Sequence, residues 1–331
     1  MLAVQYASFG IPTEVAELIN LAEPKAPGAG EALVEVERVA INPADLLRLE
    51  GRYGNNVAAL PGFAGAEGVG RVLDVGPGVS RVKPGDRVLV HQYFAGMGTW
   101  RERLVMRADV LIAMPLADLS QLAMLSVNPA TALLMLTDFV SLMEGEWVIQ
   151  NAANSAVGHW LSKLAANMGL STINVVRRSD AAAELRLGGA EHVLVDGPNL
   201  ADQIGSITGG VRPRLAIDAI GGEATQRLAA SIAEGGTVVN YGLLSGEACR
   251  VAAHDTVFRD VTLRGFWLQR FWMASSQERI DELYVKLAAL VASGELSVPV
   301  EAVYGLSQLK EALEHAGRPG RTGKIVMSIK A

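Results

Sequence analysis

The chain has 331 residues, which corresponds to about two domains at roughly 150 residues per domain. Half of the residues are hydrophobic and 19% are charged, so the chain can form sizeable cores and lacks the composition of a disordered protein. A net charge of −6 gives no indication of binding to nucleic acid or to an anionic membrane. The single cysteine, Cys249, excludes internal disulfides and a zinc site built from several thiolates.

The N-terminus and the apolar segments bear on location. The first ten residues, MLAVQYASFG, lack a basic stretch followed by a long apolar one, so no secretory signal is visible. The longest apolar stretch, 130–143, is interrupted by Asp138 and is too short to cross a bilayer. We therefore expect a cytoplasmic protein that binds neither membranes nor nucleic acid.

The first third of the chain has the pattern of a β-rich domain. Residues 32–39 largely alternate between apolar and polar side chains, as a half-buried strand does. The segments 69–75 and 86–90 repeat this pattern, and glycine- and proline-containing turns at 76–78 and 83–86 lie between them.

From about residue 119 the pattern changes to strands that alternate with helices. The predicted strands are 146–151, 172–176, 191–195, 215–219, 237–241 and 261–265. The predicted helices between them are 156–168, 180–187, 200–207 and 223–233. This alternation predicts a parallel sheet covered on both faces, that is, a doubly wound α/β domain of the Rossmann type.

The C-terminal part returns to β-rich sequence after one helix. Apolar residues at three- and four-residue spacing mark an amphipathic helix over 280–291, and 298–304 and 324–329 are predicted strands. We therefore expect the Rossmann-type domain, residues 119–295, to be inserted into a β-rich domain formed by residues 1–118 and completed by 296–331.

The segment that follows the first strand of the α/β part has the features of a phosphate-binding turn. Residues 151–158 read Asn-Ala-Ala-Asn-Ser-Ala-Val-Gly and lead into a helix. Small residues allow close approach of a ligand, and the helix N-terminus favours a pyrophosphate. The sequence is not G-x-G-x-x-G, and an ordinary strand–helix loop remains the alternative.

The end of the next strand distinguishes between the two dinucleotides. An NAD site usually carries an acidic side chain there, which binds the ribose 2′-hydroxyl. In this chain the strand ends in Arg177 and Arg178, whose guanidinium groups suit a 2′-phosphate, with two solvated arginines as the alternative. Asp180 is expected to cap the following helix. The sequence therefore predicts NADPH as the cofactor.

Several segments together resemble the medium-chain dehydrogenase/reductase superfamily. Within it, they are most similar to the zinc-free 2-enoyl thioester reductases, the mitochondrial trans-2-enoyl-CoA/ACP type. The resemblance implies that the β-rich domain is a GroES-like catalytic domain. The matching segments span nearly the whole chain in the family's order: 41–45 (INPAD), 50–54 (EGRYG), 98–101 (GTWR), 127–131 (VNPAT), 150–158 (QNAANSAVG), 173–177 (INVVR), 241–242 (YG) and 264–268 (RGFWL).

The zinc ligands of the superfamily's alcohol dehydrogenases have no counterparts in this sequence. Asn42 and Pro43 stand near the expected cysteine, and Gly65-Ala66-Glu67 stands where those enzymes have Gly-His-Glu. The cysteine-rich lobe that holds structural zinc is also missing. Because zinc needs three or four ligands, we predict that the protein holds no metal.

Without a Lewis acid, reduction of an activated C=C bond fits the sequence better than reduction of an alcohol-type carbonyl. Hydride passes from the nicotinamide to Cβ, the thioester carbonyl delocalises the charge, and a proton donor supplies Cα. Tyr53 matches the family's catalytic tyrosine, with packing in a glycine-flanked loop as the alternative. Trp100, Phe266 and Trp267 are the predicted substrate pocket, with core packing or a subunit interface as the alternative.

The resemblance also implies a set of cofactor contacts. Ala156 departs from the family's usual glycine, and its methyl group would crowd the pyrophosphate turn. The implied contacts are Asn42, Asn128, Asn154, Ser155, Ala156, Val157, Gly158, Arg177, Arg178, Tyr241, Gly242, Phe266, Trp267, Leu268 and Lys324.

The predicted function is NADPH-dependent reduction of the C=C bond of 2-enoyl thioesters, carried by CoA or acyl carrier protein, in fatty acid metabolism. The enzymatic alternative is a zinc-free quinone oxidoreductase or a reductase of small enals. A non-catalytic NADPH-binding protein is the third hypothesis. Members of this type are commonly dimers, so we expect a homodimer, with the strand over 261–266 as a candidate for joining two sheets.

Overall fold

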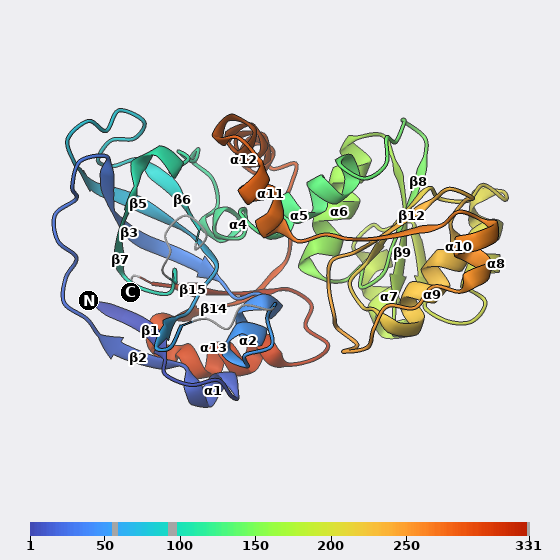
Figure 1. Cartoon of the computed structure of the whole chain (residues 1–331), viewed down its shortest axis with the longest axis horizontal. Helices are drawn as coiled ribbons and strands as arrows, with labels where there is room; N and C mark the ends of the chain where they lie inside the picture. Colours follow the sequence, from blue (N-terminus) through green and yellow to red (C-terminus); the bar gives the residue numbers. More distant parts are fainter. Residues whose placement is uncertain (55–58, 92–97, 330–331) are drawn as a thin grey trace. The chain divides into compact units, whose positions relative to one another are not determined.

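The computed structural model of the protein describes residues 1–54, 59–91 and 98–329 (Figure 1). Its internal contacts divide the chain into two compact units. Unit 1 comprises Met1–Ala130 and Trp272–Ala331, and unit 2 comprises Thr131–Phe271. No helix in the described part of the chain is both long enough and apolar enough to span a membrane.

The main sheet of unit 1 combines strands from both ends of the chain. Its order is β14-β15-β3-β5-β6, and β7 also pairs with β3. The C-terminal β15 runs antiparallel to β3, with Val326 opposite Ala40. The predicted strands at both ends are confirmed, and their bounds are β3 (Glu31–Ala40), β5 (Glu67–Val75), β6 (Arg87–His91), β7 (Arg103–Arg107), β14 (Val300–Gly305) and β15 (Lys324–Ser328).

Alternating apolar residues build the core of unit 1. Val34 and Val36 on β3, Leu104 on β7 and Met327 on β15 are buried in one hydrophobic cluster, as the period of two predicts. A smaller antiparallel sheet has the order β2-β1-β4. Its strands and the short helices of unit 1 are β1 (Leu2–Tyr6), β2 (Glu17–Asn20), β4 (Gly62–Phe63), α1 (Pro12–Val15), α2 (Pro43–Leu49), η1 (Ala108–Val110), α4 (Leu119–Ala123) and η2 (Leu306–Gln308).

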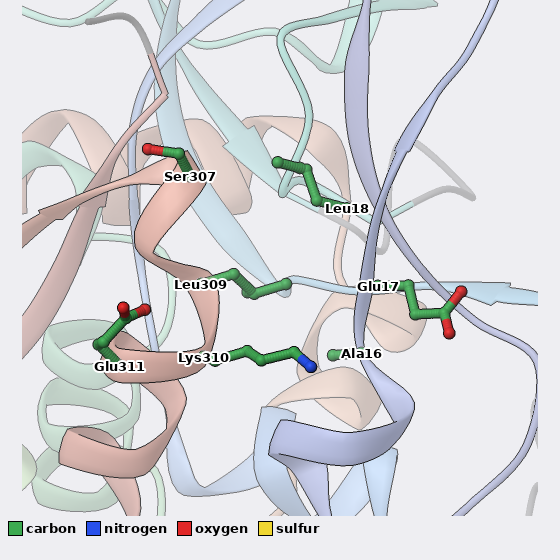
Figure 2. A pocket seen from close by; sticks show the side chains of 7 residues that line it. All are labelled: Ala16, Glu17, Leu18, Ser307, Leu309, Lys310 and Glu311. Carbon is green, nitrogen blue, oxygen red and sulfur yellow. The ribbon is translucent and has the colours of Figure 1, made fainter.

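Helix α13 (Leu309–Gly317) was not among the predicted elements. It buries Leu309, Ala312, Leu313 and Ala316, which are spaced as one face of a helix. Figure 2 shows the side chains around an open pocket of about 460 Å³ next to this helix. None of the predicted site residues is among those that line it: Ala16, Glu17, Leu18, Ser307, Leu309, Lys310 and Glu311.

Unit 2 contains a parallel sheet of the order β10-β9-β8-β11-β12-β13. This is the strand order of the doubly wound dinucleotide-binding fold, with its topological switch between β8 and β11. The predicted strands agree with the structure to within one residue at each end. The strands are β8 (Trp147–Gln150), β9 (Ser171–Val176), β10 (His192–Val195), β11 (Leu215–Asp218), β12 (Thr237–Asn240) and β13 (Thr262–Gly265).

The predicted helices of unit 2 are also confirmed. Leu200, Ile204 and Leu228 from two of them pack with strand residues such as Ile149 and Val175 in one core cluster. The confirmed helices are α6 (Ala156–Asn167), α7 (Ser179–Leu187), α8 (Leu200–Thr208) and α9 (Gly222–Ser231). Helix α10 (Ala253–Phe258) was not predicted. Helices α5 (Asn128–Thr137) and α11 (Leu268–Ala274) contain the two points at which the units meet along the chain.

The boundaries of the units differ from the boundaries drawn on the sequence. The structure divides the chain at 130/131 and 271/272, whereas the sequence pattern placed the divisions at 118/119 and 295/296. Helix α4 packs against β3 and β5, and α12 (Gln277–Ala292) packs against α4, so both helices belong to unit 1. Because unit 2 also contains helices, the sequence pattern alone does not show to which unit these two belong. Their packing assigns them to unit 1.

Candidate functional site

The turn between β8 and α6 has the local structure of a phosphate-binding turn. Ser155 caps α6, and its Oγ accepts a hydrogen bond from the Gly158 amide at 3.1 Å. A Cβ at Gly158 would lie 2.4 Å from the carbonyl oxygen of Ala153, so only glycine allows this close approach. Ala156 is the first residue of the helix and is half-buried. The turn therefore presents small residues and a helix N-terminus, which fit a pyrophosphate.

A buried carboxylate ties together the strand ends beside this turn. Asp218, at the end of β11, accepts hydrogen bonds from the side chains of Asn151 (2.6 Å), Thr225 (2.6 Å) and Asn240 (3.0 Å). Asn151 in turn accepts from the Ala219 amide at 2.8 Å. The ends of β8, β11 and β12 are thus fixed at the topological switch, where open α/β sheets bind ligands. Sequence reasoning missed Asp218, although an acid that ends an otherwise apolar strand is a visible signal.

The two arginines after β9 have different surroundings. Arg178 is the N-cap residue of α7, and its Nε lies 2.9 Å from Asp180 Oδ1. Hydrogen bonding to this guanidinium holds the pKa of Asp180 below its usual value. The prediction that Asp180 caps α7 is therefore wrong: Asp180 lies in the first turn and pairs with Arg178, and its Oδ1 accepts from the Ala181 amide. Arg177 precedes this pair and is exposed.

Tyr241, Gly242 and Phe266, which are also predicted cofactor contacts, follow the carboxyl ends of strands β12 and β13. Tyr241 follows β12 and hydrogen-bonds Ser155, and burial raises the pKa of its phenol. A Cβ at Gly242 would lie 2.5 Å from the Ala219 carbonyl oxygen, so this position also requires glycine. Phe266 follows β13 and meets Phe139 edge-on, with 6.2 Å between the ring centroids.

The aromatic segment after β13 continues into α11. Phe266 and Trp267 are half-buried, and Leu268, the first residue of α11, is buried. The structure therefore leaves the start of this segment, Phe266 and Trp267, partly exposed, as a pocket wall needs.

Unit 1 contains a buried hydrogen-bond network of Asn42, Glu67, Asn128 and Lys324. Asn42 Nδ2 donates to Glu67 Oε1 at 2.7 Å. Asn42 Oδ1 accepts from Asn128 Nδ2 at 3.1 Å and from Lys324 Nζ. All four side chains are at most 5% exposed. The three members that the resemblance implies as cofactor contacts are thus gathered in one place, around a glutamate that sequence reasoning did not include.

Each member of this network stands at the end of a secondary-structure element. Asn42 is the N-cap of α2, Glu67 begins β5, Asn128 begins α5, and Lys324 begins β15. Polar residues are favoured at such ends because they satisfy backbone groups that the element leaves unpaired. The fold therefore brings together four polar residues that are far apart in the sequence.

Further hydrogen bonds hold the two residues at the centre of the network. Glu67 Oε2 accepts from Ser126 Oγ at 3.0 Å and from the Val127 amide at 2.9 Å. The backbone amide of Asn42 donates to Asp45 Oδ2 at 2.8 Å, which completes a capping box on α2. With these bonds the orientation of the Asn42 amide is set: its oxygen faces the ammonium group of Lys324, and its nitrogen faces Glu67.

Burial shifts the titration of both charged members. It raises the pKa of Glu67 to about 6, although Lys324 and the hydrogen bonds from Asn42 and Ser126 act in the opposite direction. It lowers the pKa of Lys324 to about 8, while Glu67 and Asp45 act to raise it. Near neutral pH both groups are therefore mainly charged, and the Asn42 amide hydrogen-bonds both of them.

The positions that correspond to zinc ligands in related dehydrogenases thus carry residues of this network. Asn42 stands near the expected cysteine, and Glu67 belongs to the Gly-Ala-Glu sequence. Across residues 1–54, 59–91 and 98–329, no group of three or more His, Cys, Asp or Glu side chains could hold a metal ion.

A chain of aromatic residues continues from the network. Trp272 Nε1 donates to the Tyr284 hydroxyl at 2.9 Å, and this hydroxyl donates to the Ser126 carbonyl oxygen at 2.8 Å. The ring of His91 lies against Trp272, with 3.8 Å between the centroids. Burial lowers the pKa of His91 to about 3, so its imidazole is neutral. None of these contacts was predicted from the sequence.

Tyr53 and Trp100 differ in exposure. Tyr53 lies in the loop after α2, is half-buried, and has the guanidinium of Arg48 at 5.1 Å from its ring centroid. Trp100 is fully buried in the core of unit 1, and a Cβ at Gly65 would lie 2.3 Å from its ring. This placement of Trp100 corresponds to the core-packing alternative and gives no support to a place in the substrate pocket.

Comparisons with known proteins cover nearly the whole chain. The family models for the alcohol dehydrogenase GroES-like domain and for the zinc-binding dehydrogenases match residues 28–116 and 156–289. The human mitochondrial enoyl-[acyl-carrier-protein] reductase is 36% identical over an alignment of 333 positions, which covers 99% of this chain and 88% of that protein.

Solved structures agree with this result. The mitochondrial 2-enoyl thioester reductase heterodimer Etr1p/Etr2p of Candida tropicalis has a TM-score of 0.84 at 25% identity, and a complex of Etr1p with NADP and crotonyl-CoA gives the same values. A quinone oxidoreductase of Pseudomonas syringae has a TM-score of 0.86 at 25% identity. Each comparison covers 99% of both chains.

A GroES-like β-rich unit combined with a Rossmann-type sheet, without the zinc ligands, defines a zinc-free medium-chain dehydrogenase/reductase. Within that superfamily, the chain belongs to the family of the mitochondrial-type enoyl-acyl-carrier-protein (2-enoyl thioester) reductases. The resemblance and the fold class that the sequence predicted are confirmed.

The prediction of a cytoplasmic protein is wrong in the light of these relatives, which are named mitochondrial enzymes. It rested on the lack of a visible secretory signal. A secretory signal concerns export, and its absence does not distinguish the cytoplasm from an organelle.

Proposed function

We propose that the protein reduces the C=C bond of 2-enoyl thioesters with NADPH. The observation that carries this proposal is the similarity, over 99% of the chain, to enzymes named enoyl-[acyl-carrier-protein] reductases. The predicted reaction class agrees with that family. CoA or acyl carrier protein would carry the acyl group, and fatty acid metabolism is the corresponding setting.

The residues of unit 2 fit an NADP-type cofactor. The N-terminus of α6, with Ser155 to Gly158, would hold the pyrophosphate, and the exposed guanidinium of Arg177 would hold the 2′-phosphate. Etr1p, a structural relative, was crystallised with NADP. We expect Arg177→Ala to raise the KM for NADPH about tenfold or more and to leave the KM for NADH nearly unchanged, which steady-state kinetics with both cofactors measures. Equal effects on both would remove Arg177 from the 2′-phosphate site.

The bound cofactor supplies the hydride that reduces Cβ of the substrate. Tyr53 would then donate its phenolic proton to Cα, or hydrogen-bond to the thioester oxygen while negative charge develops there. The guanidinium of Arg48, 5.1 Å from the Tyr53 ring centroid, orients the ring and is attracted to its face. Asn128 and Lys324 would contribute polar contacts to the cofactor from unit 1, and Phe266 and Trp267 would line the acyl group.

The test is NADPH oxidation with crotonyl-CoA and longer 2-enoyl-CoA substrates, comparing the wild type with Tyr53→Phe. We expect kcat to fall about a hundredfold or more in the variant, because a positioned proton donor contributes that much, while the Kd for NADPH stays unchanged. Turnover of small quinones but not of enoyl thioesters would establish the quinone oxidoreductase alternative, which the similarity to the Pseudomonas syringae enzyme favours. Tight NADPH binding without turnover of either class would indicate a non-catalytic protein.

We further propose a homodimer formed through the edge of the unit 2 sheet. Strand β13 pairs with β12, its residues are all exposed, and Leu263 is 39% exposed. Phe258, at the end of α10, is 74% exposed. An exposed strand edge beside apolar side chains suits pairing with a second copy of the chain. We expect Leu263→Arg to sediment as a monomer and the wild type as a dimer.

A further inference from the structure

Unit 1 contains a second polar cluster, which the proposed mechanism does not use. We call Glu301, Tyr304 and His315 the Glu301 clamp. The Tyr304 hydroxyl lies 2.8 Å from His315 Nδ1, and His315 Nε2 lies 2.9 Å from Glu301 Oε1. The other carboxylate oxygen of Glu301 accepts from the backbone amides of Thr322 and Gly323, at 2.7 and 3.0 Å. The clamp therefore fastens the segment directly before Lys324 to strand β14 and helix α13.

Two features of the backbone make this attachment close. The register of β14 against β15 shifts between Val300 and Ala302, so Glu301 is an additional residue on β14 at this irregularity, as in a β-bulge. Bulges of this kind redirect a side chain, often next to a functional site. A Cβ at Gly323 would lie 2.7 Å from the Glu301 amide nitrogen, so only glycine allows the two segments to approach this closely.

Lys324 is consequently held from two sides. Its backbone amide donates to the Pro299 carbonyl oxygen at 2.9 Å, and the two amides before it donate to Glu301. Its ammonium group donates to Asn42 in the buried network. We propose that Glu301 is a positioning residue for Lys324: through the backbone of Gly323 it fixes where the ammonium group stands. His315 and Tyr304 hold the Glu301 carboxylate in place. That Glu301 thereby affects NADPH binding rests on the proposed function, in which Lys324 contacts the cofactor.

The charges around the clamp are consistent with this role. Burial alone would raise the pKa of Glu301, but hydrogen bonds from His315, Thr322 and Gly323 lower it overall, so the carboxylate is ionised at neutral pH. The charges that act on Lys324 are those of Glu67, Asp45 and Arg321. The link from Glu301 to Lys324 that the structure shows is the backbone of Thr322 and Gly323, whose amides donate to the Glu301 carboxylate.

The direct test follows the titration of Lys324 by NMR in lysine-labelled protein, with the signal assigned from Lys324→Met. We expect Glu301→Ala to raise the pKa of Lys324 toward that of a solvated lysine, because the released segment no longer holds the ammonium in the buried network. Glu301→Gln retains an acceptor oxygen and should show a smaller change. The control is Glu314→Gln, an exposed carboxylate on helix α13 next to His315, whose partner is Arg318 at 2.7 Å. An unchanged titration in Glu301→Ala would overturn the proposal.

The functional test is a double-mutant cycle on NADPH affinity, measured by fluorescence titration. Glu301→Ala is expected to weaken binding about fivefold to tenfold, the range of residues that act through a network. In the Lys324→Met background it should cause no further loss, because the two positions act as one. Additive losses would contradict the proposal. An unchanged affinity in Lys324→Met would instead contradict the assigned cofactor role of Lys324, while the titration still decides whether Glu301 positions it. Should Glu301→Ala not fold, Tyr304→Phe serves in both measurements.

Discussion

Glu67 in unit 1 and Asp218 in unit 2 are both fully buried carboxylates, and their hydrogen-bonding needs are satisfied in different ways. Asp218 of unit 2 accepts from neutral donors that stand at the ends of neighbouring strands and in the helix that follows. Glu67 of unit 1 also accepts from neutral donors, but it shares the Asn42 amide with a buried cation, Lys324. Asp218 therefore holds together the carboxyl ends of the strands at the topological switch. Glu67 instead belongs, with Lys324, to a charged pair whose protonation depends on pH.

This difference matters for what each unit can contribute. The hydrogen bonds that neutral donors give to Asp218 preorganise the strand ends at the topological switch and bring no further charge to them. Two opposite charges buried on one amide keep an ammonium group at a set position in a medium of low polarity, where it interacts strongly with any charged ligand. Substitutions in the two arrangements should therefore differ in their effects on stability.

The largest expected effect is that of removing the acid from the charged pair. Glu67→Leu removes the larger of the two negative charges that act on the buried ammonium of Lys324, and it deprives Asn42 and Ser126 of their acceptor. We expect a loss of about 3 kcal/mol in the free energy of unfolding, measured by urea denaturation at neutral pH. Glu67→Gln is the control and should lose less, since its amide oxygen still accepts hydrogen bonds. A loss below about 1 kcal/mol for the leucine variant would show that the pair is not buried as described.

The contrast between the two carboxylates also bears on what the sequence reveals. The strands and helices of unit 2 follow from short-range pattern, because each apolar run is bounded by turn residues and the phosphate turn lies between neighbouring elements. In the unit 1 network, Asn42 is 25 positions from Glu67 and 282 positions from Lys324. No periodicity connects such residues. Asn42, Asn128 and Lys324 entered the prediction through the family resemblance, and Glu67 entered only as a position that lacks a zinc ligand.

Two other outcomes have local physical causes. Helix α13 was missed because its nine residues lie between two predicted strands, where an amphipathic pattern of this length is hard to separate from loop sequence. Asp180 was expected to cap α7, but Arg178 takes the N-cap position and pairs with it, which the sequence alone does not distinguish. In both cases tertiary and side-chain contacts decide between local alternatives of similar energy.

The second prediction uses the pH dependence of the charged pair. The pKa of Glu67 is about 6 in the folded protein and 4.5 without the fold, so between these values the folded state binds more protons than the unfolded state. Stability contributed by this group therefore falls as pH rises through this window, by about 2 kcal/mol at 1.36 kcal/mol per unit. We expect the difference in unfolding free energy between wild type and Glu67→Gln to change by this amount from pH 4.5 to 7. A constant difference would contradict the raised pKa.

The smallest effect on stability is expected from a substitution at Asp218. In Asp218→Asn the remaining oxygen can still accept from Asn151, and the new amide nitrogen can donate to Thr225 Oγ. Only the side-chain amide of Asn240 then loses an acceptor, because it faces the new N–H group. It retains its hydrogen bond to the Gly242 carbonyl oxygen at 3.0 Å. We therefore expect a loss of about 1 kcal/mol in the free energy of unfolding, measured by urea denaturation at neutral pH. A loss as large as that of Glu67→Leu would mean that the charge of Asp218, and not only its hydrogen bonds, stabilises the edge of the sheet, and the contrast between the two units would then disappear.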